Sequence, residues 1–87
     1  MSDTEEFLAR EVIEAFEQRG LKIATAESCT GGMVGAALTD IAGSSTVFER
    51  GFITYSNEAK MELLGVSEQT LAAHGAVSAE TAQEMAA

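Results

Sequence analysis

The stretch LKIATAESCTGGMVGAALTDI, residues 21–41, carries the clearest signal for the fold. Its first part, residues 21–28, is short and carries β-branched side chains, which predicts a strand. Thr30 is the expected N-cap of a helix that begins in residues 31–32 and runs to Ala42, because apolar residues recur there at helical spacing. The expected order is therefore strand, glycine turn, helix.

The regions on either side continue this alternation. Upstream, apolar residues at i, i+4, i+7 and i+8 predict an amphipathic helix over residues 4–19, with a cap at residue 2, 3 or 4. Its predicted apolar face consists of Leu8, Val12, Ala15 and Phe16. Downstream, TVFERGFITY at 46–55 predicts a second strand, in which Gly51 indicates a bulge or a close backbone approach. Three short helices are expected over residues 57–64, 67–74 and 78–87.

This order predicts an α/β fold. Two strands joined by a helix are expected to be parallel, through a right-handed crossover. Because a parallel sheet is normally covered on both faces, we expect a three-layer α/β/α arrangement with a mainly parallel sheet. Two strands are few for such a sheet, and the last helix lacks a closing glycine or a basic last turn. We therefore expect residues 1–87 to be a single, partial domain that supplies about the first half of the fold.

Composition excludes several classes of protein. Five Lys and Arg against fourteen Asp and Glu give a net charge of −9, which disfavours nucleic-acid binding. Cys29 is the single cysteine and His74 the single histidine, so neither an internal disulfide nor a structural zinc site is expected. The sequence has neither a basic leader nor an apolar run long enough to span a membrane, which predicts a cytoplasmic protein without membrane contact.

The segment AESCTGG at 26–32 is a candidate reaction site. A strand that runs into glycines before a helix presents backbone N–H groups to a phosphate or an oxyanion. The alternative is a turn that needs glycine only for its backbone. Ser28 and Cys29 are competing nucleophiles, and by residue chemistry alone Cys29 is the better one, because serine needs an external base.

The segment RGFITYSNEAK at 50–60 is the second candidate. It holds the only Lys or Arg between residues 23 and 87. Tyr55 is expected at the strand end and Lys60 in the first turn of the next helix, where α/β sheets bind ligands. A lysine acts as a general base only when neutral, which requires burial beside uncharged groups. The alternative is a solvated lysine that pairs with Glu58 or Glu62.

Five segments of the sequence together resemble the CinA C-terminal domain family, whose enzymatic members are nicotinamide-nucleotide amidases of the PncC type. They are TAESCTGG at 25–32, DIAGSS at 40–45, FERGFITYSNEAK at 48–60, LLGV at 63–66 and HGAVS at 74–78. The resemblance implies hydrolysis of nicotinamide mononucleotide to nicotinate mononucleotide and ammonia, which recycles pyridine nucleotide toward NAD. It implies a small-molecule nicotinamide nucleotide as partner, neither metal nor cofactor, and association into a homo-oligomer.

The resemblance also implies roles for particular residues. Ser28 becomes the nucleophile in place of Cys29, Lys60 its base, and Tyr55 a relay between them. The implied substrate-binding residues are Thr30, Gly31 and Gly32, through their backbone N–H groups, and Ser45 and Arg50. Glu27 either orients Lys60 or satisfies local hydrogen bonds.

The family domain is longer, and its second half carries a further glycine-rich segment that helps to form the site. Two other interpretations therefore remain open. One is a catalytically silent nucleotide-binding module, and the other is an inactive truncated fragment of the family.

Overall fold

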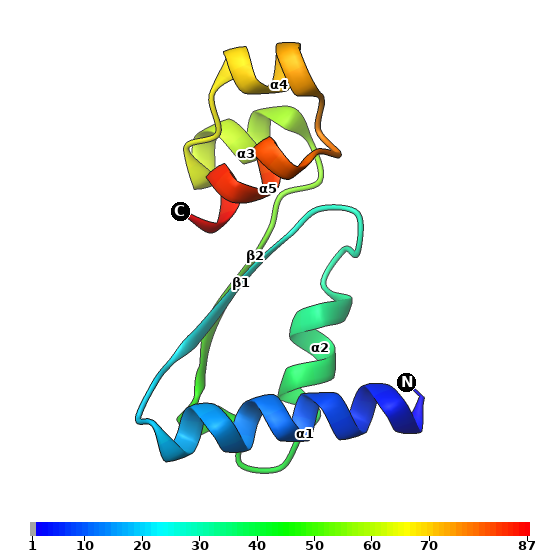
Figure 1. The fold of residues 1–87 in the computed structure, drawn as a ribbon, viewed down its shortest axis with the longest axis vertical. Coiled ribbons are helices and arrows are strands. Elements are labelled where there is room, and N and C mark those ends of the chain that lie inside the picture. Colours follow the sequence, from blue (N-terminus) through cyan, green and yellow to red (C-terminus); the bar gives the residue numbers. More distant parts are fainter. Residues whose placement is uncertain (1) are drawn as a thin grey trace. The chain divides into compact units, whose positions relative to one another are not determined.

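The structure is a computed structural model that describes residues 2–87 (Figure 1). Its elements are α1 (Asp3–Gln18), β1 (Ile23–Glu27), α2 (Met33–Thr39), the 3-10 helix η1 (Ser44–Thr46), β2 (Phe48–Ile53), α3 (Asn57–Leu64), α4 (Glu68–His74) and α5 (Ala79–Ala86). This order confirms the predicted alternation and the α/β class. No helix within residues 2–87 combines the length and the apolar character that a membrane crossing requires.

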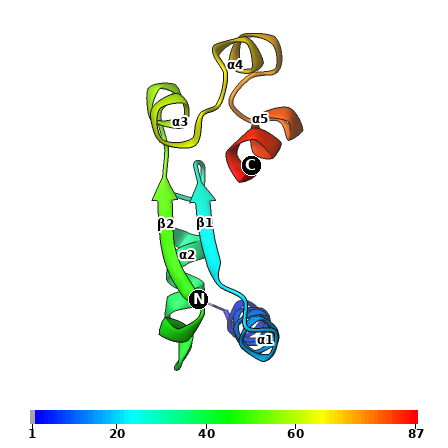
Figure 2. The same ribbon diagram turned by 90° about the vertical axis from the view of Figure 1, so that its left-hand side faces the viewer.

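The two strands form one parallel sheet. Ile23 N–H donates to the Val47 carbonyl at 2.8 Å, and Thr54 N–H donates to the Glu27 carbonyl, also at 2.8 Å. The start of one strand thus pairs with the start of the other, and the ends pair likewise. Figure 2 shows both arrows pointing the same way.

The chain divides into two compact units. The first comprises the described residues up to Thr25 together with residues 32–51, and so contains α1, α2 and η1. The second comprises residues 26–31 and 52–87, and so contains the loop after β1 and the helices α3, α4 and α5. Each unit has its own kind of interior.

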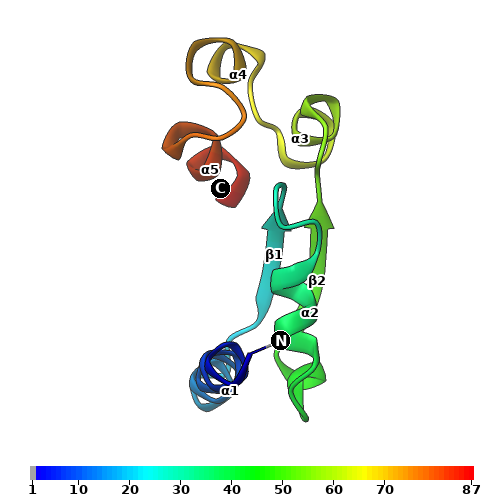
Figure 3. The same ribbon diagram turned by 90° about the vertical axis from the view of Figure 1, so that its right-hand side faces the viewer.

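An apolar cluster forms the interior of the first unit, in which α1 packs against α2 (Figure 3). Its buried members are Ala9, Ile13, Leu38, Ile41 and Val47. The predicted face of α1 is confirmed at Phe16, which packs against the cluster, and is wrong at Leu8, Val12 and Ala15, which are exposed. Ala9 and Ile13 are buried instead. They share the cluster with Leu38 of α2, a tertiary contact that the helical spacing did not reveal.

The helix after the glycines is shorter than predicted. Gly31 and Gly32 have φ values of 60° and 104°, so neither can be part of a right-handed helix, and α2 begins at Met33. Gly32 is the N-cap without a side-chain hydrogen bond. The prediction that Thr30 caps this helix is therefore wrong, because its hydroxyl donates instead to the Glu27 carboxylate at 2.6 Å.

Gly51 confirms the expected close approach between the strands. A Cβ atom at Gly51 would lie 2.7 Å from Thr25 Oγ1, closer than real side chains allow. The Thr25 hydroxyl is itself buried, with no hydrogen-bond partner among the described residues. Glycine at this position therefore lets Thr25 fill the space beside β2.

A serine caps each of the three C-terminal helices. Ser56, Ser67 and Ser78 each accept a hydrogen bond from the backbone N–H three residues later, at 3.1 Å in every case. Gly65 and Gly75 follow α3 and α4 with positive φ. The ends of these short helices are thus determined by local sequence.

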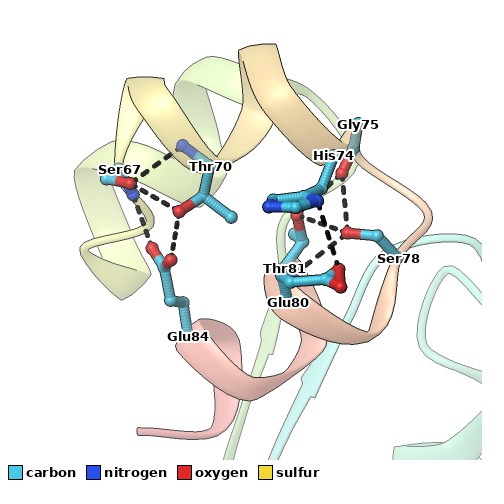
Figure 4. Close-up of polar contacts among 8 residues, drawn as sticks. All are labelled: Ser67, Thr70, His74, Gly75, Ser78, Glu80, Thr81 and Glu84. Carbon is cyan, nitrogen blue, oxygen red and sulfur yellow. Dashed lines mark hydrogen bonds and ion pairs between the residues drawn. The ribbon is translucent and has the colours of Figure 1, made fainter.

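Polar contacts join α4 to α5 (Figure 4). The Glu84 carboxylate accepts hydrogen bonds from the Thr70 hydroxyl and, at 2.8 Å, from the Ser67 backbone N–H. These hydrogen bonds hold the pKa of Glu84 below its ordinary value of 4.5, and the bond from Thr70 has the largest effect. Near the other end of α4, the Thr81 hydroxyl donates to the Gly75 carbonyl at 2.7 Å. Side chains of α5 thus satisfy backbone groups at both ends of α4.

Candidate functional site

The predicted site residues are distributed over both units. Five of them belong to the second unit: Ser28, Thr30, Gly31, Tyr55 and Lys60. The other three, Gly32, Ser45 and Arg50, belong to the first. The second unit therefore contains the predicted nucleophile, base and relay together.

Ser28 lies immediately after β1, at the start of a tight turn. The Gly31 backbone N–H donates to the Ser28 carbonyl at 3.2 Å, and the positive φ of Gly31 lets the chain reverse there. Ser28 is half-buried, whereas Cys29 is exposed. The two candidate nucleophiles are thus adjacent in sequence but differ in their access to solvent.

Lys60 is the least expected interior residue. Its side chain is 1% exposed, and Nζ donates to the Tyr55 carbonyl at 3.1 Å. Ser56 caps the helix that carries Lys60 and thereby fixes where this first turn begins. The interpretation of Lys60 as a solvated surface lysine is wrong, because Glu58 and Glu62 are both exposed while Lys60 is not.

The backbone of Tyr55 forms a hydrogen bond with Lys60. The residue is 76% exposed and follows the end of β2, and the Tyr55 carbonyl accepts the lysine hydrogen bond. What this structure provides is a backbone acceptor that holds the lysine nitrogen in place.

Glu27, which was expected to orient Lys60 or to satisfy local hydrogen bonds, and Thr54, which was not predicted, connect these parts; the carboxylate of Glu27 does accept a local hydrogen bond. Thr54 is fully buried, and both its N–H (2.8 Å) and its hydroxyl (3.3 Å) donate to the Glu27 carbonyl. Glu27 is 5% exposed, and its carboxylate accepts from Thr30. The strand pattern around residue 54 could have indicated burial of Thr54. Its bond to Glu27 depends on strand register, which the sequence does not specify.

The first-unit candidates are more accessible. Ser45 is exposed within η1. Arg50 is also exposed and pairs with its neighbour Glu49 at 3.2 Å, and such a surface pair contributes little to stability. Its guanidinium therefore remains accessible to an anionic ligand.

His74 and possible metal-binding groups are the remaining features. No group of three His, Cys, Asp or Glu side chains within residues 2–87 is arranged to hold a metal ion. His74 ends α4, as predicted, and is half exposed. Its Nδ1 lies 3.6 Å from a carboxylate oxygen of Glu80 in α5.

Several known proteins are similar to this chain over most of its length. The model of the CinA C-terminal domain matches residues 5–87. The chain is 58% identical over 87 residues to nicotinamide-nucleotide amidohydrolase PncC of Escherichia coli, covering 99% of this chain and 53% of that protein. It is 65% identical over 80 residues to a CinA-like protein of Chloroherpeton thalassium, covering 92% of this chain and 19% of that protein.

A solved structure also has the same fold. The crystal structure of competence/damage inducible protein CihA from Agrobacterium tumefaciens matches with a TM-score of 0.96 and 53% identity, covering 99% of this chain and 52% of that one. The chain thus spans about half the length of this protein and of the PncC protein.

Proposed function

This chain belongs to the CinA C-terminal domain family, and we propose that its site acts in hydrolysis of the carboxamide of nicotinamide mononucleotide. The products would be nicotinate mononucleotide and ammonia. Formation of nicotinate mononucleotide returns pyridine nucleotide toward NAD. The observation that carries this proposal is the buried Lys60, held by the Tyr55 carbonyl in the unit that contains Ser28. The similarity to a relative named for this reaction supports it.

The reaction proceeds in two halves. Ser28 Oγ attacks the carboxamide carbon while neutral Lys60, directly or through the Tyr55 phenol, takes the hydroxyl proton. The tetrahedral intermediate collapses, the C–N bond breaks, and the proton passes from Lys60 to the leaving ammonia. Water then adds to the Ser28 ester and loses a proton to Lys60. The ester bond breaks, and Lys60 returns this proton to Ser28 Oγ, which restores the serine hydroxyl and the neutral base.

Backbone N–H groups of the turn supply electrostatic stabilisation. Those of Thr30, Gly31 and Gly32 are the proposed donors to the oxyanion or to the nucleotide phosphate. The Gly31 N–H already donates to the Ser28 carbonyl, so it would exchange this partner on binding. Ser45 and Arg50 are the proposed further substrate contacts, and the guanidinium of Arg50 suits the phosphate.

A second candidate function is nucleotide binding without chemistry. It is favoured by relatives that carry another name, such as the putative competence-damage inducible protein of Caldicellulosiruptor saccharolyticus, 59% identical over 75 residues. In both cases the proposed partner is a small nicotinamide nucleotide, and we propose a cytoplasmic homo-oligomer that uses neither cofactor nor nucleic acid.

Ammonia release from nicotinamide mononucleotide by the complete gene product tests the proposal. Ser28→Ala should abolish release while nucleotide binding persists, and Cys29→Ala should retain most of it. Loss only in Cys29→Ala would overturn the choice of nucleophile. Nucleotide binding without any ammonia release in the parent protein would favour the silent module.

A further inference from the structure

We propose that Glu27 is a positioning residue that fixes the turn carrying Ser28. The inference rests on the proposed function, since it concerns how the nucleophile is held. It is carried by three hydrogen bonds around Glu27 and by the burial of this carboxylate. Glu27 itself touches no reacting atom in this role.

The backbone of Glu27 is fixed first. Its carbonyl accepts from both the N–H and the hydroxyl of Thr54, which is fully buried. Two donors on one carbonyl tie the end of β1 to the end of β2 at a place from which water is excluded. In such a place these bonds are costly to break, because each group would be left unsatisfied.

The side chain of Glu27 then closes the turn. The Thr30 hydroxyl donates to the Glu27 carboxylate at 2.6 Å, a short bond of the charge-assisted kind. Residues 27–30 therefore form a ring closed by one side-chain hydrogen bond, and Ser28 lies inside that ring. Thr30 is exposed, so its bond to the buried carboxylate of Glu27 ties a surface residue of the turn to the interior.

The same junction leads to the proposed base. Thr54 precedes Tyr55, whose carbonyl holds Lys60 Nζ. A continuous path of covalent and hydrogen bonds thus runs from Ser28 through Glu27 and Thr54 to Lys60. Because misplacement of a reacting group by about 1 Å can cost on the order of a hundredfold in rate, loosening of Glu27 should act on turnover.

The first readout is kinetic. Thr30→Val removes the hydroxyl at nearly constant shape, and we expect kcat for ammonia release to fall about tenfold with KM changed less than about twofold. Glu27→Ala should lower kcat at least as much. Adding Thr30→Val to Glu27→Ala should cause little further loss, because the bond is already gone. Thr30→Ser, which keeps the hydroxyl, should lose clearly less than Thr30→Val.

A matched control removes a hydroxyl elsewhere. The Thr39 hydroxyl donates to the Gly35 carbonyl at 2.9 Å on the exposed side of α2. Thr39→Val makes the same chemical change as Thr30→Val at a position outside the proposed site. It should leave kcat and KM at the parent values.

The second readout is independent of amidase activity. Cys29 is exposed inside the Glu27–Thr30 ring, so its rate of reaction with a disulfide reagent reports the order of the turn. Modification would be followed on the peptide that carries Cys29 in the complete gene product. Thr30→Val and Glu27→Ala should change this rate several-fold in the same direction, and the double variant should match Glu27→Ala alone.

The two readouts separate the possible failures. Independent, additive effects of Thr30→Val and Glu27→Ala on the Cys29 rate would overturn the positioning role, as would a kcat unaffected by either substitution in an active parent. Coupled Cys29 rates in a parent that releases no ammonia would contradict the proposed function while supporting the anchoring of the turn by Glu27.

Discussion

The two units of the chain bury different kinds of side chain. The first unit encloses a mainly apolar cluster around Ile13 and Val47. Among the described residues of the second unit, Val66 is the one buried hydrophobic side chain, and the other buried residues are polar: Glu27, Thr54, Lys60 and Thr81. Buried polar side chains add little to the stability of the fold. They are held in fixed positions, because each must keep its hydrogen-bond partner. We therefore expect the first unit to contribute most of the stability and the second to hold its polar groups in fixed positions.

Loss of the buried lysine should have the largest effect in the second unit. Lys60→Met replaces the amine by an apolar chain of similar length, and ammonia release should fall about a thousandfold or more because the proposed base is gone. Steady-state kinetics on the folded variant measure this effect. Lys22→Met is the matched control, since the exposed Lys22 also donates to a carbonyl, that of Thr46 at 2.8 Å. Equal losses in both variants would contradict a special role for Lys60.

Truncation of the apolar cluster should have the largest effect in the first unit. Ile13→Ala removes a side chain that is 2% exposed, and the free energy of unfolding should fall by about 2–5 kcal/mol. Leu8→Ala, on the exposed side of the same helix, should change it by less than about 0.5 kcal/mol. Denaturant unfolding compares the two. A larger loss of unfolding free energy in Leu8→Ala than in Ile13→Ala would show that the apolar face predicted from the sequence is the buried one.

The close approach between the strands gives a smaller effect. Gly51→Ala would place a methyl group 2.7 Å from Thr25 Oγ1 and should lower the free energy of unfolding by about 1–3 kcal/mol. Thr25→Ala in the same background should recover much of this loss, because it removes the atom that collides. Additive losses in a double-mutant cycle would show that the two positions do not touch.

The contacts between α4 and α5 should give the smallest effect, visible in the pH dependence of stability. Hydrogen bonds from Thr70 and Ser67 hold the pKa of Glu84 below 4.5, so the folded state binds the proton less tightly than the unfolded state. The resulting stabilisation is present above the unfolded pKa of 4.5 and is lost as pH falls through the lower, folded value. Glu84→Gln should therefore flatten the fall in stability between about pH 5 and pH 3. If stability fell with pH equally steeply in Glu84→Gln and in the parent, the stabilisation of ionised Glu84 by these hydrogen bonds would be contradicted.

Local signals in the sequence predicted most of the fold. The serine caps and closing glycines of α3 and α4 were predictable, because they satisfy or permit backbone groups within a few residues. The buried side of α1 was not fully predictable, because it depends on how α1 packs in the cluster with Leu38 of α2. The site residues show the same difference. Motif resemblance indicated Ser28, Lys60 and Glu27, whereas the bond between Thr54 and the Glu27 carbonyl depends on strand register, which is a tertiary property.

Direct capture of the covalent intermediate tests the central claim that the second unit places Ser28 for attack on a carboxamide. The complete gene product would be mixed with nicotinamide mononucleotide, quenched in acid during turnover, digested, and analysed by mass spectrometry. We predict an acyl group on the peptide of residues 28–29, located on Ser28, retained in Cys29→Ala and absent in Ser28→Ala. An acyl group located on Cys29 would contradict it, as would continued turnover by Ser28→Ala.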